Sequence, residues 1–241
     1  MLKKFLYTMF CIAALVAAMS FTAATGSITI TFSNYVGNSL LKLDSATYKN
    51  ELDQAYTVLK FKYYVGNIHL KKNDGSEYVS DKYYLINEEE AASKQITLSN
   101  VPEGNYTSIS FMLGVDSLHN CSGAQTDALD PVNAMFWAWN TGYIFVKMEG
   151  RSPVSTQPGH LLEFHIGGYM QPNNCIRIIN LPIKKGMQVG SKAAMLHVKA
   201  DVSELFKTPT SIDFAKLSSV TDLHNATTIA NNYMDMFSIL P

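Results

Sequence analysis

The stretch that decides the fold is Ser27-Ile-Thr-Ile-Thr-Phe-Ser-Asn-Tyr35, near the start of the chain. Its apolar residues Ile28, Ile30 and Phe32 alternate with serine and threonine. A period of two places alternate side chains on opposite faces of a strand. The segment therefore predicts a strand with one face against a hydrophobic core.

Further β-rich segments follow at near-regular spacing, separated by turn residues. They cover residues 56–72, 78–86, 95–98, 105–115, 143–149, 161–166, 175–181 and 194–202. Asn73-Asp74-Gly75 predicts a hairpin between the first two, because Asp-Gly suits turns that need a positive φ. Many short strands with regular turns predict an all-β fold, namely an antiparallel, immunoglobulin-like β-sandwich.

The C-terminal segment has a helical period instead. Ala226, Ile229, Ala230, Tyr233, Met234 and Phe237 recur at the spacing of one helix face. This pattern predicts a short amphipathic helix over about 222–236. Thr221 and Asp222 are its candidate N-caps.

The first 24 residues have the composition of a secretory signal peptide. Lys3 and Lys4 precede an apolar run over about 5–18, and small residues follow it. The run is too short for a comfortable membrane span. We therefore predict a signal peptide over 1–24, one mature domain over 25–241, no stable membrane span after cleavage, and a periplasmic or secreted location.

Composition excludes some partners. Of the 241 residues, 47% are hydrophobic and 16% are charged, and removal of residues 1–24 leaves 17 basic against 20 acidic residues. A nucleic-acid binder needs a basic excess that this chain lacks, so we expect no nucleic-acid partner. The mature cysteines are Cys121 and Cys175, which form either a disulfide or two separately buried thiols.

Residues 111–150 hold the most informative motifs. The segments are Gly114-Val115-Asp116, Ala128-Leu129-Asp130-Pro131, Met135-Phe-Trp-Ala-Trp-Asn-Thr-Gly-Tyr143 and Glu149-Gly150. Both tryptophans of the protein, Trp137 and Trp139, lie here, and on a strand their rings share one face. From the residues alone they are either core aromatics beside a turn or an aromatic binding surface.

This stretch resembles the MbnP family of methanobactin-associated periplasmic copper-binding proteins. The family pattern has a Gly-Val-Asp strand end, a Gly-Ala-Leu-Asp-Pro-like segment, a Met-x-Trp-x-Trp-x-x-Gly-Tyr motif and a following Glu-Gly turn. Residues 63–68, 164–168 and 229–237 also look like family segments. The similarity therefore spans nearly the whole mature chain.

The resemblance implies a secreted, non-enzymatic β-sandwich that binds copper and serves copper handling or uptake. It also implies a partner, an MbnH-like di-haem peroxidase that oxidises a tryptophan of the MbnP protein to kynurenine. The kynurenine then lies at or near the copper. Trp137 and Trp139 both match the motif, and the resemblance does not decide between them.

Copper prefers imidazole nitrogen, with thioether sulfur added for Cu(I). The best candidate ligand is His165, in a Phe-His-x-Gly strand, with Glu163 on its face. Further candidates are His119, in the motif loop, His197, mid-strand, and Met135. The alternative for each histidine is a hydrogen-bonded surface residue, and the alternative for Met135 is a methionine of the hydrophobic core. Asp116 and Asp130 fit loop-fixing Asx turns better than metal ligation.

Two other functions remain as alternatives. One is an exported glycan-binding or adhesion module that stacks sugars on exposed Trp137, Trp139 and Tyr143. The other is a hydrolase, which needs a deep pocket with two carboxylates of shifted pKa. The chain has no Gly-x-Ser-x-Gly, phosphate-loop or His-Glu-x-x-His motif, so we predict that it is not an enzyme.

Overall fold

The computed structural model describes residues 24–137 and 142–241 of the chain. The predicted signal peptide lies outside these residues, apart from Ala24. Within the described part, no helix is both long enough and apolar enough to cross a membrane.

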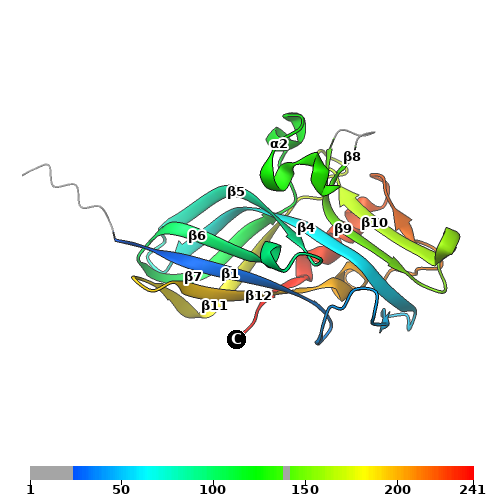
Figure 1. The fold of residues 1–241 in the computed structure, drawn as a ribbon, viewed down its shortest axis with the longest axis horizontal. Coiled ribbons are helices and arrows are strands. Elements are labelled where there is room, and N and C mark those ends of the chain that lie inside the picture. The colour runs from blue at the N-terminus through cyan, green and yellow to red at the C-terminus, as the bar shows by residue number, and fades with distance from the viewer. Residues whose placement is uncertain (1–23, 138–141) are drawn as a thin grey trace, which may run out of the picture.

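Strand β1, Thr25–Val36, lies at the centre of a five-stranded sheet (Figure 1). Its burial alternates as the sequence predicts, with Ile28, Ile30 and Phe32 almost fully buried. The other strands of this sheet are β2 (Ser39–Leu40), β6 (Gln95–Pro102), β12 (Ala194–Asp201) and β14 (Phe237–Ile239).

Strand β4, Ala55–Lys72, organises a nine-stranded sheet because its 18 residues reach several partners. Those partners are β3 (Tyr48–Lys49), β5 (Glu77–Asn87), β7 (Gly104–Leu113) and β9 (Gly142–Arg151). The remaining strands are β8 (Phe136–Trp137), β10 (Leu161–Gly167), β11 (Arg177–Val189) and β13 (Ser219–Val220). The predicted hairpin joins β4 to β5, where Gly75 has φ +87° and donates to the Lys72 carbonyl.

Aromatic rings fill the space between the two sheets. Phe32 of the smaller sheet packs edge-on against Phe111 of the larger sheet, with ring centroids 5.8 Å apart. It also meets Tyr63 at 6.2 Å and Phe237 at 6.5 Å. Burial of each such ring contributes roughly 1.5–3 kcal/mol, so these contacts hold the sheets face to face.

The predicted β-sandwich is confirmed. Most strand pairs are antiparallel, while β1–β12 and β10–β13 are parallel. Cys121 and Cys175 are both free thiols in this structure, so no disulfide joins them. Cys175 is buried as the second alternative predicted, but Cys121 is exposed.

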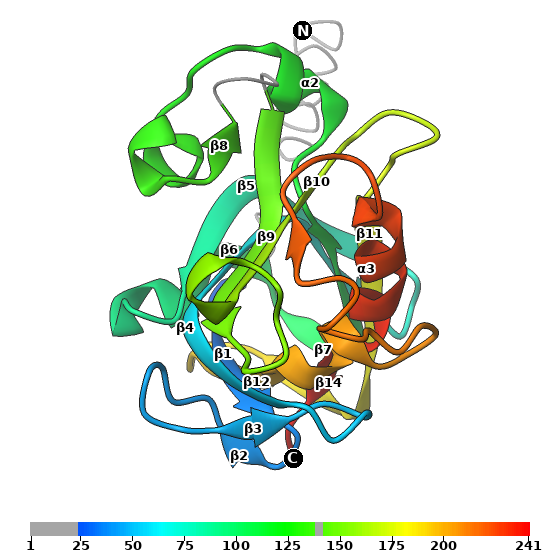
Figure 2. The same cartoon turned by 90° about the vertical axis from the view of Figure 1, so that its right-hand side faces the viewer.

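The helices are short. They are α2 (Ser117–Cys121), α3 (Ala226–Asn232) and the 3-10 turns η2 (Ala91–Lys94), η3 (Asp127–Leu129), η4 (Pro131–Asn133), η5 (Pro158–His160), η6 (Val202–Phe206) and η7 (Tyr233–Asp235). The C-terminal helix is therefore confirmed as α3 followed by η7, with α3 beside β10 (Figure 2) and both elements beside η6.

The predicted N-caps of this helix are wrong. Asn225, with φ +61°, occupies the N-cap position, and α3 begins at Ala226. The Asp222 side chain instead accepts from the His224 N–H. An aspartate that bonds two residues onward forms a turn of its own, which delays the start of the helix.

Candidate functional site

A segment that carries α2, η3, η4 and β8 covers the outside of the nine-stranded sheet over β5 and β9 (Figures 1 and 2). Asp116 is the N-cap of α2 and accepts from the His119 N–H at 2.8 Å. Asp130 accepts from the Val132 N–H at 2.9 Å. Both aspartates therefore fix the loop, as their interpretation as Asx residues predicted.

Trp137 lies inward rather than on the surface. Strand β8 pairs with the start of β9, and the Trp137 side chain belongs to the core, with 5% of the residue exposed. Its indole lies against Gly167 of β10, where an added Cβ would be 2.7 Å from Cζ3. Tyr143 is 1% exposed and donates to the Leu129 carbonyl. Neither ring can serve as an exposed sugar-stacking surface, and Trp139 lies outside the described residues.

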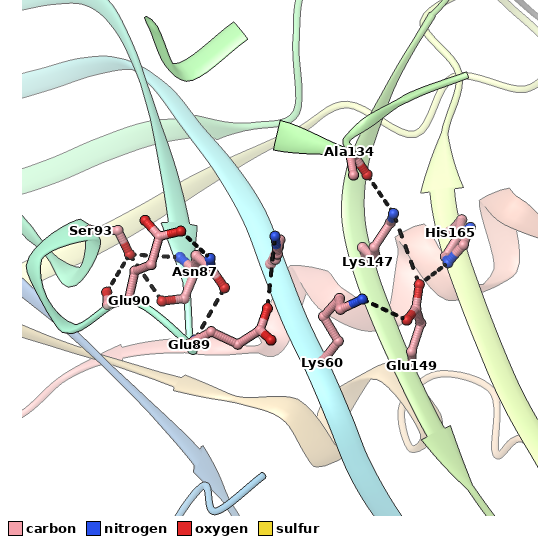
Figure 3. Close-up of polar contacts among 10 residues, drawn as sticks. Lys60, Asn87, Glu89, Glu90, Ser93, Ala134, Lys147, Glu149 and His165 are labelled. Carbon is pink, nitrogen blue, oxygen red and sulfur yellow. Dashed lines mark hydrogen bonds and ion pairs between the residues drawn. The ribbon is translucent and has the colours of Figure 1, made fainter. Parts of the chain in front are cut away.

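His165 lies on β10, two residues before Gly167, against which the Trp137 indole packs. Its Nε2 lies 3.0 Å from Glu149 Oε1 (Figure 3). Lys60 Nζ lies 3.2 Å from the other oxygen of the same carboxylate. Lys147, opposite His165 on β9, donates to the Ala134 carbonyl just before Met135. The network thus ties three strands to the covering segment.

This network is strongly polarised. The hydrogen bond with His165 and the Lys60 ammonium lower the pKa of Glu149 to about 2, against the opposing effect of burial. Burial lowers the pKa of Lys147, whereas the Glu149 carboxylate opposes that shift. Glu149 is therefore ionised at neutral pH and is the common acceptor of the cluster.

His119 occupies a second polar cluster, on α2. Its Nδ1 lies 2.9 Å from Asp116 Oδ1, and its ring packs on Tyr83 with centroids 4.7 Å apart. Burial alone would raise the pKa of Asp116, but hydrogen bonds from His119 and Tyr83 outweigh it and lower that pKa. His119 lines an adjoining hollow together with Gln125 and Asp127.

The other candidate ligands lie elsewhere. His197 is exposed on β12 of the five-stranded sheet, opposite Thr31, whereas His165 belongs to the nine-stranded sheet. Met135 is fully buried in the hydrophobic core. Across residues 24–137 and 142–241, no group of three histidine, cysteine, aspartate or glutamate side chains is arranged to hold a metal ion.

Sequence reasoning missed the residues that surround His165. Glu163 was the expected acidic neighbour, but the carboxylate in contact is that of Glu149 on the adjacent strand. Glu149 ended the predicted strand over 143–149 and matched, with Gly150, the family's Glu-Gly turn, whereas both residues lie inside β9. Lys60 and Lys147 carried no motif signal, because only the strand register brings them to the site.

Comparisons with known proteins agree with the resemblance seen in the sequence. A family model described as MbnP matches residues 25–225. Among solved structures, MbnP from Methylosinus trichosporium superposes with a TM-score of 0.54 at 14% identity, covering 81% of this chain and 83% of that one. That likeness shows a shared fold, and no curated protein matches the chain. From the extent of the family match, this chain belongs to the MbnP family.

Proposed function

We propose that this protein is an exported copper-binding protein that takes part in copper handling or uptake, with copper as its cargo. Family membership supports the proposal. The observation that carries it is the pairing of His165 Nε2 with Glu149 Oε1 at 3.0 Å, on the strand that the Trp137 indole covers.

The donor set suits Cu(II). An imidazole nitrogen and a carboxylate oxygen are both ligands of that ion. Lys60 and Lys147 compete for the same carboxylate, and the described residues supply two protein donors at this position. Few protein ligands and competing cations make binding weak, so we expect a site that accepts and releases copper rather than one that retains it.

His165→Ala is expected to weaken Cu(II) binding by at least roughly tenfold, because even residues that only orient a ligand contribute that much to metal affinity. The measurement is calorimetric titration of residues 25–241 with Cu(II), with electron paramagnetic resonance to detect nitrogen coordination.

The matched control is His224→Ala, since His224 is an exposed histidine in the loop before α3. It should bind copper as the unchanged protein does. Absence of stoichiometric copper binding in the unchanged protein would contradict the proposed function. An equal loss of copper affinity in His165→Ala and His224→Ala would show that His165 is not a copper ligand.

We also propose that an MbnH-like di-haem peroxidase is the partner and that it converts Trp137 or Trp139 to kynurenine. Family membership supports this step. The conversion adds two oxygen atoms to the indole and then loses its formyl group by hydrolysis, a net gain of one oxygen and loss of one carbon, so intact mass should rise by about 4 Da in protein made with the partner.

Peptide mapping of that protein assigns the modified tryptophan, with protein made without the peroxidase as control. Trp137→Phe should abolish the mass change if Trp137 is the substrate, and Trp139→Phe if Trp139 is. An unchanged mass in the presence of an active partner would contradict this part of the proposal.

A further inference from the structure

A groove of about 730 Å³ opens where the free edges of the two sheets meet. Strand β11 is the edge of the nine-stranded sheet and forms one wall, while β12 and β14, at the edge of the five-stranded sheet, form the other. The groove lies on different strands from the His165 network and takes no part in the proposed copper site.

The floor of the groove reaches the hydrophobic core. Leu181, Ile183, Met187, Leu196 and Phe237 line it, and each is 5–8% exposed. Most other core side chains are fully shielded. These five therefore present the apolar interior to whatever enters the groove, and Met195, exposed by 64%, extends that apolar surface to the mouth.

The wall formed by β11 is irregular and carries charge. Strand β11 leaves its register with β7 between Pro182 and Met187, so residues 183–186 bulge away from the sheet. Lys184 and Lys185 are exposed on this bulge and line the groove. No described acidic side chain forms an ion pair with either lysine. Two ammonium groups that pair with no described acidic side chain thus line an apolar groove.

We propose that this groove binds a single-chain anionic amphiphile, a fatty carboxylate, with its acyl chain over the apolar floor and its carboxylate at Lys184 and Lys185. The volume lies within the range of small-molecule sites, and an apolar lining with a few polar groups at one end is their usual composition. Charge complementarity sets the direction of the ligand, because the cations lie on one wall only.

An extended peptide fits the groove less well. Leu240 donates to the His197 carbonyl, and the Asp201 N–H donates to the Met236 carbonyl. The edge of β12 between His197 and Asp201 is therefore already paired, mainly by β14. Strand addition needs a row of free backbone groups. The β12 edge leaves few of them, and on the β11 edge the irregularity between Pro182 and Met187 interrupts such a row.

The test is titration of residues 25–241 with laurate below its micelle concentration, followed by the NMR signals of ¹³C-labelled methionine methyl groups. Met187 and Met195 should shift in a saturable way, while Met112 and Met148, outside the groove, should not. Uncharged 1-dodecanol should bind about tenfold more weakly, since it offers no charge to the lysines.

Lys184→Ala/Lys185→Ala should weaken laurate binding about tenfold and leave dodecanol binding unchanged. The matched control is Lys42→Ala/Lys82→Ala, which removes two exposed lysines outside the groove. Met195→Glu, at an exposed position, should abolish laurate binding without disturbing the core.

Three outcomes would overturn the proposal. One is no saturable shift of Met187 and Met195. Another is equal loss in both lysine double variants. The third is a dimer that Met195→Glu dissociates while laurate does not bind, which would assign the groove to a second copy of the chain. Sedimentation of the same samples distinguishes that case.

Discussion

Gly167→Val is expected to destabilise the protein by about 3 kcal/mol and to displace Trp137. A Cβ at Gly167 would lie 2.4 Å from the Tyr143 carbonyl oxygen and 2.7 Å from Trp137 Cζ3. The strand cannot easily retreat, because β10 is hydrogen-bonded to β9 on one side and to β13 on the other. Either the indole or the start of β9 must move.

Urea unfolding, followed by circular dichroism, measures the loss of stability, and native-state tryptophan fluorescence reports the displaced indole through a red-shifted emission. The matched control is Gly190→Val, where the nearest atom to an added Cβ is Glu103 Oε1 at 4.0 Å. Near-equal stability of the two variants, with unchanged emission, would show that Gly167 does not hold Trp137 against β10.

Local patterns in the sequence were sufficient for the long strands but not for the short strands β2, β3, β8, β13 and β14. Alternation in Ser27-Ile-Thr-Ile-Thr-Phe gave β1, and the Asp74-Gly75 turn gave the β4–β5 hairpin. Both features depend on residues close together in the chain. The parallel pairing of β1 with β12 joins residues more than 160 positions apart, and no local pattern encodes such a partner.

The candidate site could be predicted only in part, because its residues come from strands that are far apart in the sequence. His165 was identified from its own strand, but its partners Lys60 and Glu149 come from β4 and β9. A shift of one residue in either pairing would move these side chains to the opposite face. Trp137 shows a second limit, because an indole beside a turn is compatible with burial or exposure until the covering segment is placed.

The Glu149 carboxylate should stabilise the folded protein, because it is the shared acceptor of a largely buried cluster of charged side chains. Lys147 is 7% exposed, and its ammonium lies 3.9 Å from Glu149 Oε1. Removal of the carboxylate charge leaves that ammonium and His165 without their acid partner. The cost of stranding a buried charge exceeds the value of an ordinary surface ion pair, so the loss should be measurable.

Glu149→Gln is therefore expected to lower the free energy of unfolding by about 2 kcal/mol at pH 7, after allowance for solvent screening. The folded-state pKa of Glu149 is about 2, below the ordinary 4.5. The stabilisation is thus fully present above the unfolded value and is lost as pH falls from about 5 to about 2. The unchanged protein and Glu149→Gln should converge in stability across that window, as urea unfolding at pH 7, 5 and 3 will measure.

Glu163→Gln is the matched control, since Glu163 lies opposite Glu149 on β10 and makes no ion pair with a described residue. A constant difference between Glu149→Gln and the unchanged protein at all three pH values would mean that the Glu149 charge does not stabilise the cluster.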